Sequence, residues 1–336
     1  MLDTRIDLLT SLNHRPFKPL ALFKTGHQQT LAAVFWPTGF DAPFQINHII
    51  ELGDGDRLSL LENTTSDPNA PICLLVHGLT GSHRSNYMVR LTRKLVKAGY
   101  RACRLNLRGC GTGIGLAQHP YHSGRSDDLK TTLAYLSNRY PGIPIHILSF
   151  SLGANLALKM TGEMGGLKPN TFVSLSAISP PLDLYASVRR IGASPNRIYD
   201  QYFAKALVKS VEAIEAHFPE LSSHSLAHVN SIFEFDDIYT APINGFKDAR
   251  DYYTRCSSQH FISDIRVPTL ILHAKDDPLV SSNAFKSKYY GNPHLHWILT
   301  QHGGHVGFLG ATPERFSYQW MDSVLLSWIS QFNHEK

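Results

Sequence analysis

The stretch HILSFSLGAN (residues 146–155) decides the fold, because a buried strand, a tight turn and a helix follow one another in it without a linker. An apolar run ends at Phe150, the small residues Ser151 and Gly153 follow, and the helix-like NLALKM comes next. This order is typical of a nucleophile elbow, in which a serine is exposed on a sharp strand-to-helix turn. The usual pattern is G-x-S-x-G, and Ser149 stands here in place of the first glycine. The turn identifies Ser151 as a candidate nucleophile, with an ordinary helix-capping serine as the alternative.

Short apolar runs alternate with helix-period segments on both sides of this turn, a pattern that predicts a mostly parallel sheet covered by helices on both faces. The runs expected to form strands are 72–77, 101–107, 145–150, 171–179, 269–274 and 294–300. A hairpin over 45–62, with Asp54-Gly55 at its turn, is expected to add an antiparallel edge. Helices are expected over 86–100, over 126–140 with Ser126 as its cap, and over 313–332 with a proline in the first turn. The fold class is therefore α/β.

A long insertion interrupts this alternation. Roughly ninety residues separate the strand ending at 179 from the strand beginning at 269, far more than joins neighbouring elements in such folds. An amphipathic helix is predicted within it from the helical spacing of Phe203, Leu207, Val211, Ile214 and Phe218. We expect residues 1–179 and 263–336 to form the two parts of the core, and residues 180–262 to form a cap over the carboxyl ends of the strands.

The composition excludes several functional classes. The chain has 336 residues, of which 43% are hydrophobic and 18% charged, as expected of a folded globular protein. Its formal charge of +5 comes from scattered Lys and Arg, so no nucleic-acid partner is expected. Its four cysteines lack CxxC spacing and predict reduced thiols. No stretch reaches the ~18 apolar residues of a membrane helix and no signal peptide opens the chain, so we expect a cytoplasmic protein with at most peripheral membrane contact.

A serine nucleophile needs a base, and the base needs an acid to hold it. The strand over 269–274 is followed by KDDPLV, which offers Asp277 as the acid and Asp276 as its rival. The last strand is followed by QHGGHVGF, which offers His305 as the base. The order Ser, Asp, His along the chain is the one that the α/β-hydrolase fold requires.

The oxyanion that forms on attack needs two N–H donors beside the serine. One is expected to be the N–H of Leu152, at the start of the helix. The glycine-rich bend HGLTGS (77–82) follows an early strand and offers the N–H of Leu79 as the second. His77, at the end of that strand, either takes part in catalysis or orients this bend.

Several other residues invite alternative interpretations. His302 lies three residues before His305, but the glycines between them and the lack of further ligand spacing do not make a zinc site. The segment GCGTGIG (109–115) is not followed by a helix and predicts a turn instead of a dinucleotide site. Asp183 is a second rival acid, and YHSGRSDD (121–128) either touches substrate or only closes into the next helix. No cofactor and no metal is expected.

The chain resembles the α/β-hydrolase superfamily and, more narrowly, its YheT-like family of predicted hydrolases. The matching motifs occur in the family's order over roughly residues 15–332: HGLTGS, NLRGCGTG, YHSGRSDD, SFSLGAN, EFDDIYTAPINGFKDARDYY, AKDDPLV and GGHVGF. The resemblance implies Ser151 as nucleophile, Asp277 as acid and His305 as base. Relatives include monoacylglycerol lipases, phospholipases and medium-chain ethyl ester synthases. The chain departs from the family at Ser149, and the N-terminal membrane anchor that eukaryotic relatives carry is not expected here.

The resemblance implies a serine hydrolase that cleaves carboxylic esters through an acyl-enzyme on Ser151. Short- to medium-chain acyl esters or lipid-like esters are the expected substrates. Two alternatives stay open: acyl transfer to an alcohol by the same three residues, and a non-catalytic hydrolase fold that binds a ligand. The presence of all three candidate residues argues against the second alternative.

Overall fold

An eight-stranded sheet forms the centre of the computed structural model, with the strand order β1-β2-β4-β3-β5-β6-β7-β8. The structure describes the chain except residues 1–3, 36–43, 222–225, 286–290, 313–316 and 334–336. The strands are β1 (Ile46–Glu51), β2 (Arg57–Asn63), β3 (Ile72–Val76), β4 (Arg101–Asn106), β5 (Ile145–Phe150), β6 (Phe172–Ile178), β7 (Thr269–Ala274) and β8 (Leu295–Thr300). Only the β1·β2 and β2·β4 pairs of this sheet are antiparallel. The predicted parallel sheet with an antiparallel edge is confirmed.

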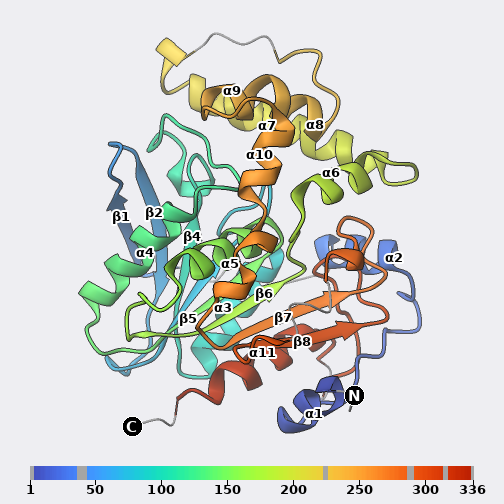
Figure 1. Cartoon of the computed structure of the whole chain (residues 1–336). Helices are drawn as coiled ribbons and strands as arrows, with labels where there is room; N and C mark the ends of the chain where they lie inside the picture. The colour runs from blue at the N-terminus through green and yellow to red at the C-terminus, as the bar shows by residue number, and fades with distance from the viewer. Residues whose placement is uncertain (1–3, 36–43, 222–225, 286–290, 313–316, 334–336) are drawn as a thin grey trace.

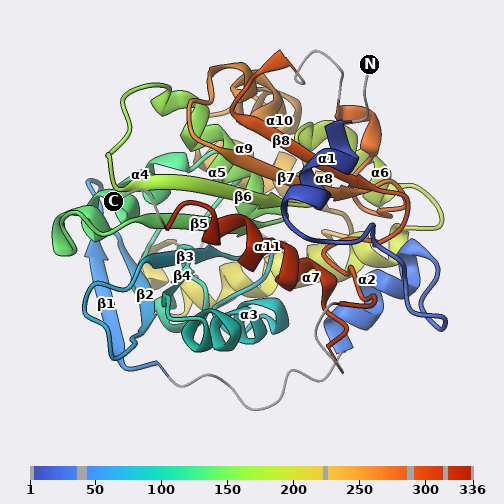
Figure 2. The same ribbon diagram turned by 90° about the horizontal axis from the view of Figure 1, so that it is seen from below.

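Helices cover both faces of the sheet (Figures 1 and 2). They are α1 (Thr4–Ser11), α2 (Gly26–Phe35), α3 (Asn86–Lys97), α4 (Ser126–Arg139), α5 (Leu152–Met164), α6 (Leu184–Gly192), α7 (Arg197–Glu215), α8 (Ile232–Phe235), α9 (Ala241–Ile243), α10 (Ala249–Cys256) and α11 (Trp320–Ser330). Apolar side chains of α4 and α5 pack with one face of the sheet, and those of α1, α3 and α11 pack with the other. No described helix is both long enough and apolar enough to cross a bilayer.

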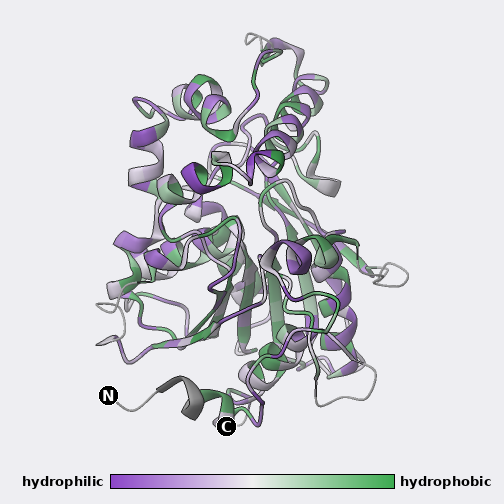
Figure 3. Ribbon diagram, turned by 90° about the vertical axis from the view of Figure 1, so that its right-hand side faces the viewer, coloured by the Kyte–Doolittle hydropathy of each residue, from purple (hydrophilic) through white to green (hydrophobic). Residues whose placement is uncertain are grey.

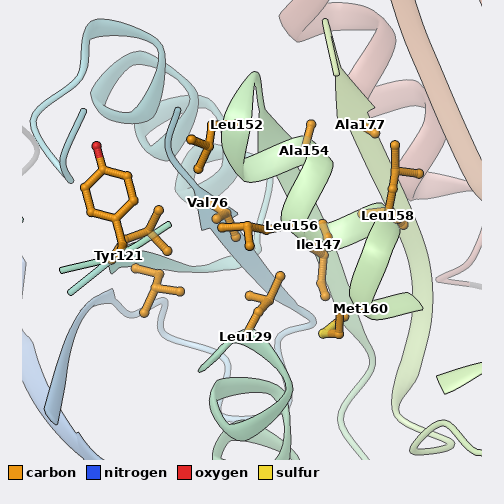
Figure 4. Close-up of a cluster of buried hydrophobic side chains, with 14 of the residues drawn as sticks. Val76, Tyr121, Leu129, Ile147, Leu152, Ala154, Leu156, Leu158, Met160 and Ala177 are labelled. Atoms are coloured by element: carbon orange, nitrogen blue, oxygen red, sulfur yellow. The ribbon is translucent and has the colours of Figure 1, made fainter. Parts of the chain in front are cut away.

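The core is continuous between the sheet and α5. Every residue of β5 is buried, which is why its sequence is mostly apolar and does not alternate with exposed polar residues. Figure 4 shows Val76 and Ile147 of the sheet near Leu156 and Met160 of α5, with Leu129 of α4 beside them. Figure 3 shows how hydropathy is distributed over the molecule: the strands are hydrophobic, and hydrophilic residues lie on the helices outside them. The strand-to-helix turn at residue 151 is therefore anchored on both sides by buried elements.

The segment between β6 and β7 forms helices α6 to α10, which lie above the sheet (Figure 1). The predicted amphipathic helix is α7, and Leu207, Val211 and Ile214 are buried on its inner side. Phe218 lies beyond the end of that helix. The division of the chain at residues 179/180 and 262/263 stays a prediction.

Two local predictions are wrong. The last helix begins at Trp320, because Gln319 bridges to Leu309 as extended antiparallel backbone and is not helical. The start predicted at residue 313 lies outside the described residues. Ser126 is the first residue of α4 and does not cap it, because its Oγ donates instead to the carboxylate of Glu163 at 2.6 Å.

Candidate active site

Ser151 lies on a strained turn between β5 and α5. Its backbone has φ 52° and ψ −121°, a left-handed conformation that costs energy in a residue other than glycine. The turn is held because its N–H donates to the carbonyl of Ile178 at 2.9 Å, and its carbonyl accepts from Ala154 and Asn155 in the first turn of α5. The side chain is thereby presented at the end of the strand, as in a nucleophile elbow.

Ser149, the departure from the usual motif, fits this turn. Its side chain is fully buried in β5, and its Oγ donates to the backbone oxygen of Ser176 in the neighbouring strand β6 at 2.9 Å. A buried hydroxyl that keeps a hydrogen bond has no large desolvation cost. The substitution therefore leaves the elbow geometry in place.

A chain of two hydrogen bonds connects the three predicted residues. The distance from His305 Nε2 to Ser151 Oγ is 2.8 Å, and that from His305 Nδ1 to Asp277 Oδ2 is also 2.8 Å. An ionised carboxylate only accepts, so Nδ1 carries the proton and Nε2 is free to accept from the serine hydroxyl. The other oxygen of Asp277 accepts from the N–H groups of Leu279 and Val280, at 2.8 and 2.9 Å. The structure thus brings the three residues together.

The environment of Asp277 keeps its carboxyl group ionised. Burial alone would raise its pKa, but the charge of His305 and the hydrogen bonds hold the pKa below its usual value. A buried carboxylate beside the imidazole can stabilise an imidazolium that forms when His305 takes a proton.

The two rival acids, Asp276 and Asp183, accept hydrogen bonds from backbone N–H groups and do not bind His305 through its ring. Asp276 accepts from the N–H of Gly304 at 2.9 Å and lies 3.3 Å from the ring of the exposed His302. Asp183 caps α6 by accepting from the N–H of Ala186. Within the described residues, neither carboxylate contacts the His305 ring, because Asp276 binds the loop at Gly304 and Asp183 caps α6.

His77 orients the bend that follows β3. Its Nε2 accepts from the N–H of Leu107 at 3.1 Å, and its Nδ1 donates to the carbonyl of Gly78 at 2.8 Å. Burial lowers the pKa of His77 to about 4, so the ring is neutral. Because a trans peptide holds its C=O and N–H in opposite directions, the N–H of Leu79 faces away from His77.

This bend lies against the candidate nucleophile. A Cβ added to Gly78 would lie 2.9 Å from the Cβ of Ser151, so only glycine allows this approach. Leu79 and Leu152 line the same pocket as Ser151, and the N–H group of neither residue has a hydrogen-bond acceptor among the described residues. Two free N–H donors beside the hydroxyl of a candidate nucleophile are what an oxyanion would require.

A pocket opens above Ser151 between the core and the cap. Its walls are mainly apolar and come from the bend at 79, the 121–123 loop, α5, the cap helices and the loop after β7. The residues that line it are Leu79, Tyr121, His122, Ser123, Ser151, Leu152, Pro181, Leu184, Ser187, Val188, Ile191, Phe203, Leu207, Ile232, Phe235, Asp236, Thr240, Tyr252, Tyr253, Leu279, Val280 and His305. The first part of YHSGRSDD thus faces the pocket, whereas Asp128 in its last part pairs with Arg108.

Sequence reasoning missed the support that α2 gives to the His305 loop. The hydroxyl of Thr30 accepts from the N–H of His305 at 2.9 Å, and the fully buried Gln29 bonds both the N–H and the carbonyl of Leu309. The sequence did contain a signal for the start of α2, because Thr25 and Gln28 have the spacing of a capping box, and in the structure they form its two reciprocal hydrogen bonds.

Asn155 is a second residue that was missed. It is fully buried in α5, and its amide donates to the carbonyls of Ser123 and Cys256 and accepts from the N–H of Ser258. These bonds join the helix after the elbow to one wall of the pocket and to the end of the cap. Its partners are distant in sequence, so no local pattern could have indicated them.

One group of side chains has the spacing of metal ligands. Asp54, Asp56 and His119 lie close together, away from the pocket-lining residues. Both carboxylates contact the guanidinium of Arg108 at 2.6 Å, so its positive charge already fills the place that a cation would take. The arrangement is that of an ion-pair cluster, in which Arg108 and Asp56 are buried and Asp54 is exposed.

Comparisons with known proteins identify the family and the fold. A family model described as the alpha/beta hydrolase fold matches residues 71–312. YheT of Escherichia coli (strain K12), which is named as a candidate esterase, is 33% identical over 296 residues, or 85% of each chain. A monoacylglycerol lipase of Saccharomyces cerevisiae is 29% identical over 80% of this chain and 61% of its own length. The solved esterase Pf2001 of Pyrococcus furiosus has a TM-score of 0.57 at 18% identity, over 95% of this chain and 99% of its own, and is similar in fold.

Proposed function

The chain belongs to the α/β-hydrolase fold family and to its YheT-like branch, and on this premise we propose that it is a serine esterase that works through an acyl-enzyme. An ester hydrolase of the esterase and lipase type follows from the family. We propose in addition that Ser151 is the nucleophile, His305 the base and Asp277 the acid. The substrates proposed are small-molecule or lipid-like carboxylic esters with short to medium acyl chains.

One observation carries the proposal: the unbroken hydrogen-bonded chain from Ser151 through His305 to the buried Asp277, at 2.8 Å for each step. A serine hydroxyl is a weak nucleophile unless a base takes its proton. The N–H groups of Leu79 and Leu152 supply the second requirement, a place for the negative charge.

The reaction follows from these positions. Ser151 Oγ attacks the ester carbonyl carbon while its proton moves to His305 Nε2, and the carbonyl oxygen becomes an oxyanion bound by Leu79 and Leu152. The C–O bond to the alcohol then breaks, and the departing oxygen takes the proton from His305. A water molecule repeats the sequence on the acyl-enzyme and releases the carboxylic acid.

The test is fluorophosphonate labelling of the purified protein combined with ester hydrolysis. Label is expected on Ser151, located by mass spectrometry, and is expected to be absent from Ser151→Ala and strongly reduced in His305→Ala. Ester turnover in Ser151→Ala should fall by about 10⁴-fold or more while circular dichroism stays unchanged. Wild-type ester hydrolysis in that variant would overturn the assignment.

A further inference from the structure

Asp236 is the one carboxyl group among the described residues that line the pocket above Ser151, and no Lys or Arg lines it. It belongs to the cap, on a π-helical turn (Asp236–Thr240) between α8 and α9. Single π-helical turns within helices are frequently found at functional sites. Its side chain is 7% exposed, in a cavity whose walls are otherwise mainly apolar.

The partners of Asp236 leave part of its carboxyl group unused. The hydroxyl of Tyr253 donates to Oδ2 at 2.7 Å, and the hydroxyl of Thr240 also bonds the carboxyl group. A carboxylate has about four acceptor positions, so about two remain. Two neighbouring carboxylates of the cap have a structural role instead. Asp200 accepts from the backbone N–H of Ile232, and Asp237 accepts from that of Ala249. Asp236 accepts no backbone N–H among the described residues.

An apolar pocket has a strong preference for apolar ligands, and a buried polar group in it needs a polar partner. The acyl chain of an ester offers none. The alcohol portion can offer hydroxyl groups, and a hydroxyl pairs with this carboxyl group in either protonation state, because it both donates and accepts. Burial raises the pKa of Asp236 to about 6, which disfavours the full charge that an ammonium ligand would pair with best.

We infer that Asp236 is a substrate-recognition residue that binds a free hydroxyl group on the alcohol portion of the ester. The inference rests on the proposed esterase function and narrows its substrates to esters of polyhydric alcohols. A site built to hydrogen-bond a substrate hydroxyl discriminates against an analogue that lacks it, because the buried partner is then left unpaired.

The experiment compares two esters of equal acyl chain, glycerol monooctanoate and propyl octanoate, by kcat/KM. The wild type is expected to favour the glycerol ester. Asp236→Leu, which keeps the branched shape of the side chain and removes its polar group, should lose about 10- to 100-fold on the glycerol ester and less than about threefold on the propyl ester. Asp236→Asn, which retains the acceptor for Tyr253, carries the test if the leucine variant does not fold, and a selective loss of about 3- to 10-fold is expected. The exposed neighbour variant Asp237→Asn is the matched control and should change neither value.

Three outcomes would overturn the inference. Equal losses on both esters would indicate a packing role, and unchanged selectivity would indicate no role. A loss confined to octanoylcholine, used as a third substrate, would assign the site to a cation instead of a hydroxyl. A wild-type protein that hydrolyses none of the three esters would overturn the proposed function itself, an outcome distinct from a change in selectivity.

Discussion

Asp276 and Asp277 are adjacent residues whose carboxylates have separate tasks. Asp277 is buried and bonds the imidazole of His305, whereas Asp276 bonds the backbone of Gly304 in the loop that carries this histidine. One residue thus holds the tautomer of the ring, and the other holds the position of the loop. The sequence predicts Asp277 as the acid and offers Asp276 only as its rival, because both residues follow β7 within a few positions.

The two variants Asp277→Asn and Asp276→Asn separate these tasks. In Asp277→Asn the amide still accepts from Leu279 and Val280, but it no longer fixes the proton on Nδ1 of His305 or stabilises an imidazolium. We expect kcat to fall by about 10³- to 10⁴-fold. Asp276→Asn keeps an acceptor for Gly304, and a fall of less than about tenfold is expected. Steady-state kinetics on one soluble ester decides the question, and a larger loss in Asp276→Asn would reverse the assignment.

At the scale of elements, α2 couples the N-terminal segment to the candidate site. The first residue of this helix, Gly26, lies so close to the acid loop that an added Cβ would be 1.8 Å from the backbone oxygen of Asp276. One turn later, Thr30 accepts the N–H of His305. Helix α2 therefore supports both loops of the candidate site, the one that carries the proposed acid Asp277 and the one that carries the proposed base His305.

Gly26→Ala tests this coupling. The added methyl group must displace α2 or the loop of Asp276, and a displacement of ~1 Å at a catalytic group costs up to about 100-fold in rate. We expect fluorophosphonate labelling and kcat to fall by about 10- to 100-fold with little change in the circular dichroism spectrum. Gly53→Ala is the matched control, because no atom lies within 4 Å of its added Cβ. Equal labelling rates in the two variants would show that α2 does not position the site.

The elements that sequence reasoning found and missed differ in a physical way. Strands such as β5 are buried at every residue, so their apolar runs are unmistakable, and they locate the turns that carry Ser151, Asp277 and His305. The cap residues 232–243 form α8, the π-helical turn and α9, and each of these elements has only three to five residues, which is too short for a periodic pattern to be recognised. Tertiary pairs such as Asp236 with Tyr253 leave no local pattern at all.

At the scale of the whole molecule, a buried cluster of charged side chains connects the antiparallel strands β1 and β2 to β4 and to the end of α4. These strands lie at the opposite edge of the sheet from β7 and β8, which precede the loops of Asp277 and His305. Glu62 of β2 is fully buried and bonds His48 of β1 at 2.6 Å, the guanidinium of Arg101 in β4, and the hydroxyl of Tyr140 after α4 at 2.7 Å. Removing one member of such a cluster leaves the other charge uncompensated. The cluster therefore contributes to the stability of the whole sheet without touching the pocket-lining residues.

The pH dependence of unfolding follows from Glu62. Burial by itself would raise its pKa, but the hydrogen bonds from His48, Tyr140 and Arg101 lower it from 4.5 to about 2. A carboxyl group whose folded-state pKa is depressed stabilises the fold fully above pH 4.5, and loses that contribution as the pH falls toward 2. The shift corresponds to about 3 kcal/mol of the free energy of unfolding. Glu62→Gln lacks this titration, so urea unfolding should show a gap of about 3 kcal/mol between wild type and variant at neutral pH, narrowing steadily below pH 4.5. A difference in unfolding free energy that stays constant down to pH 3 would mean that the charge of Glu62 contributes nothing beyond the packing of its side chain. Ester hydrolysis at neutral pH is the control, and Glu62→Gln should match the wild type in it whichever result the unfolding experiment gives.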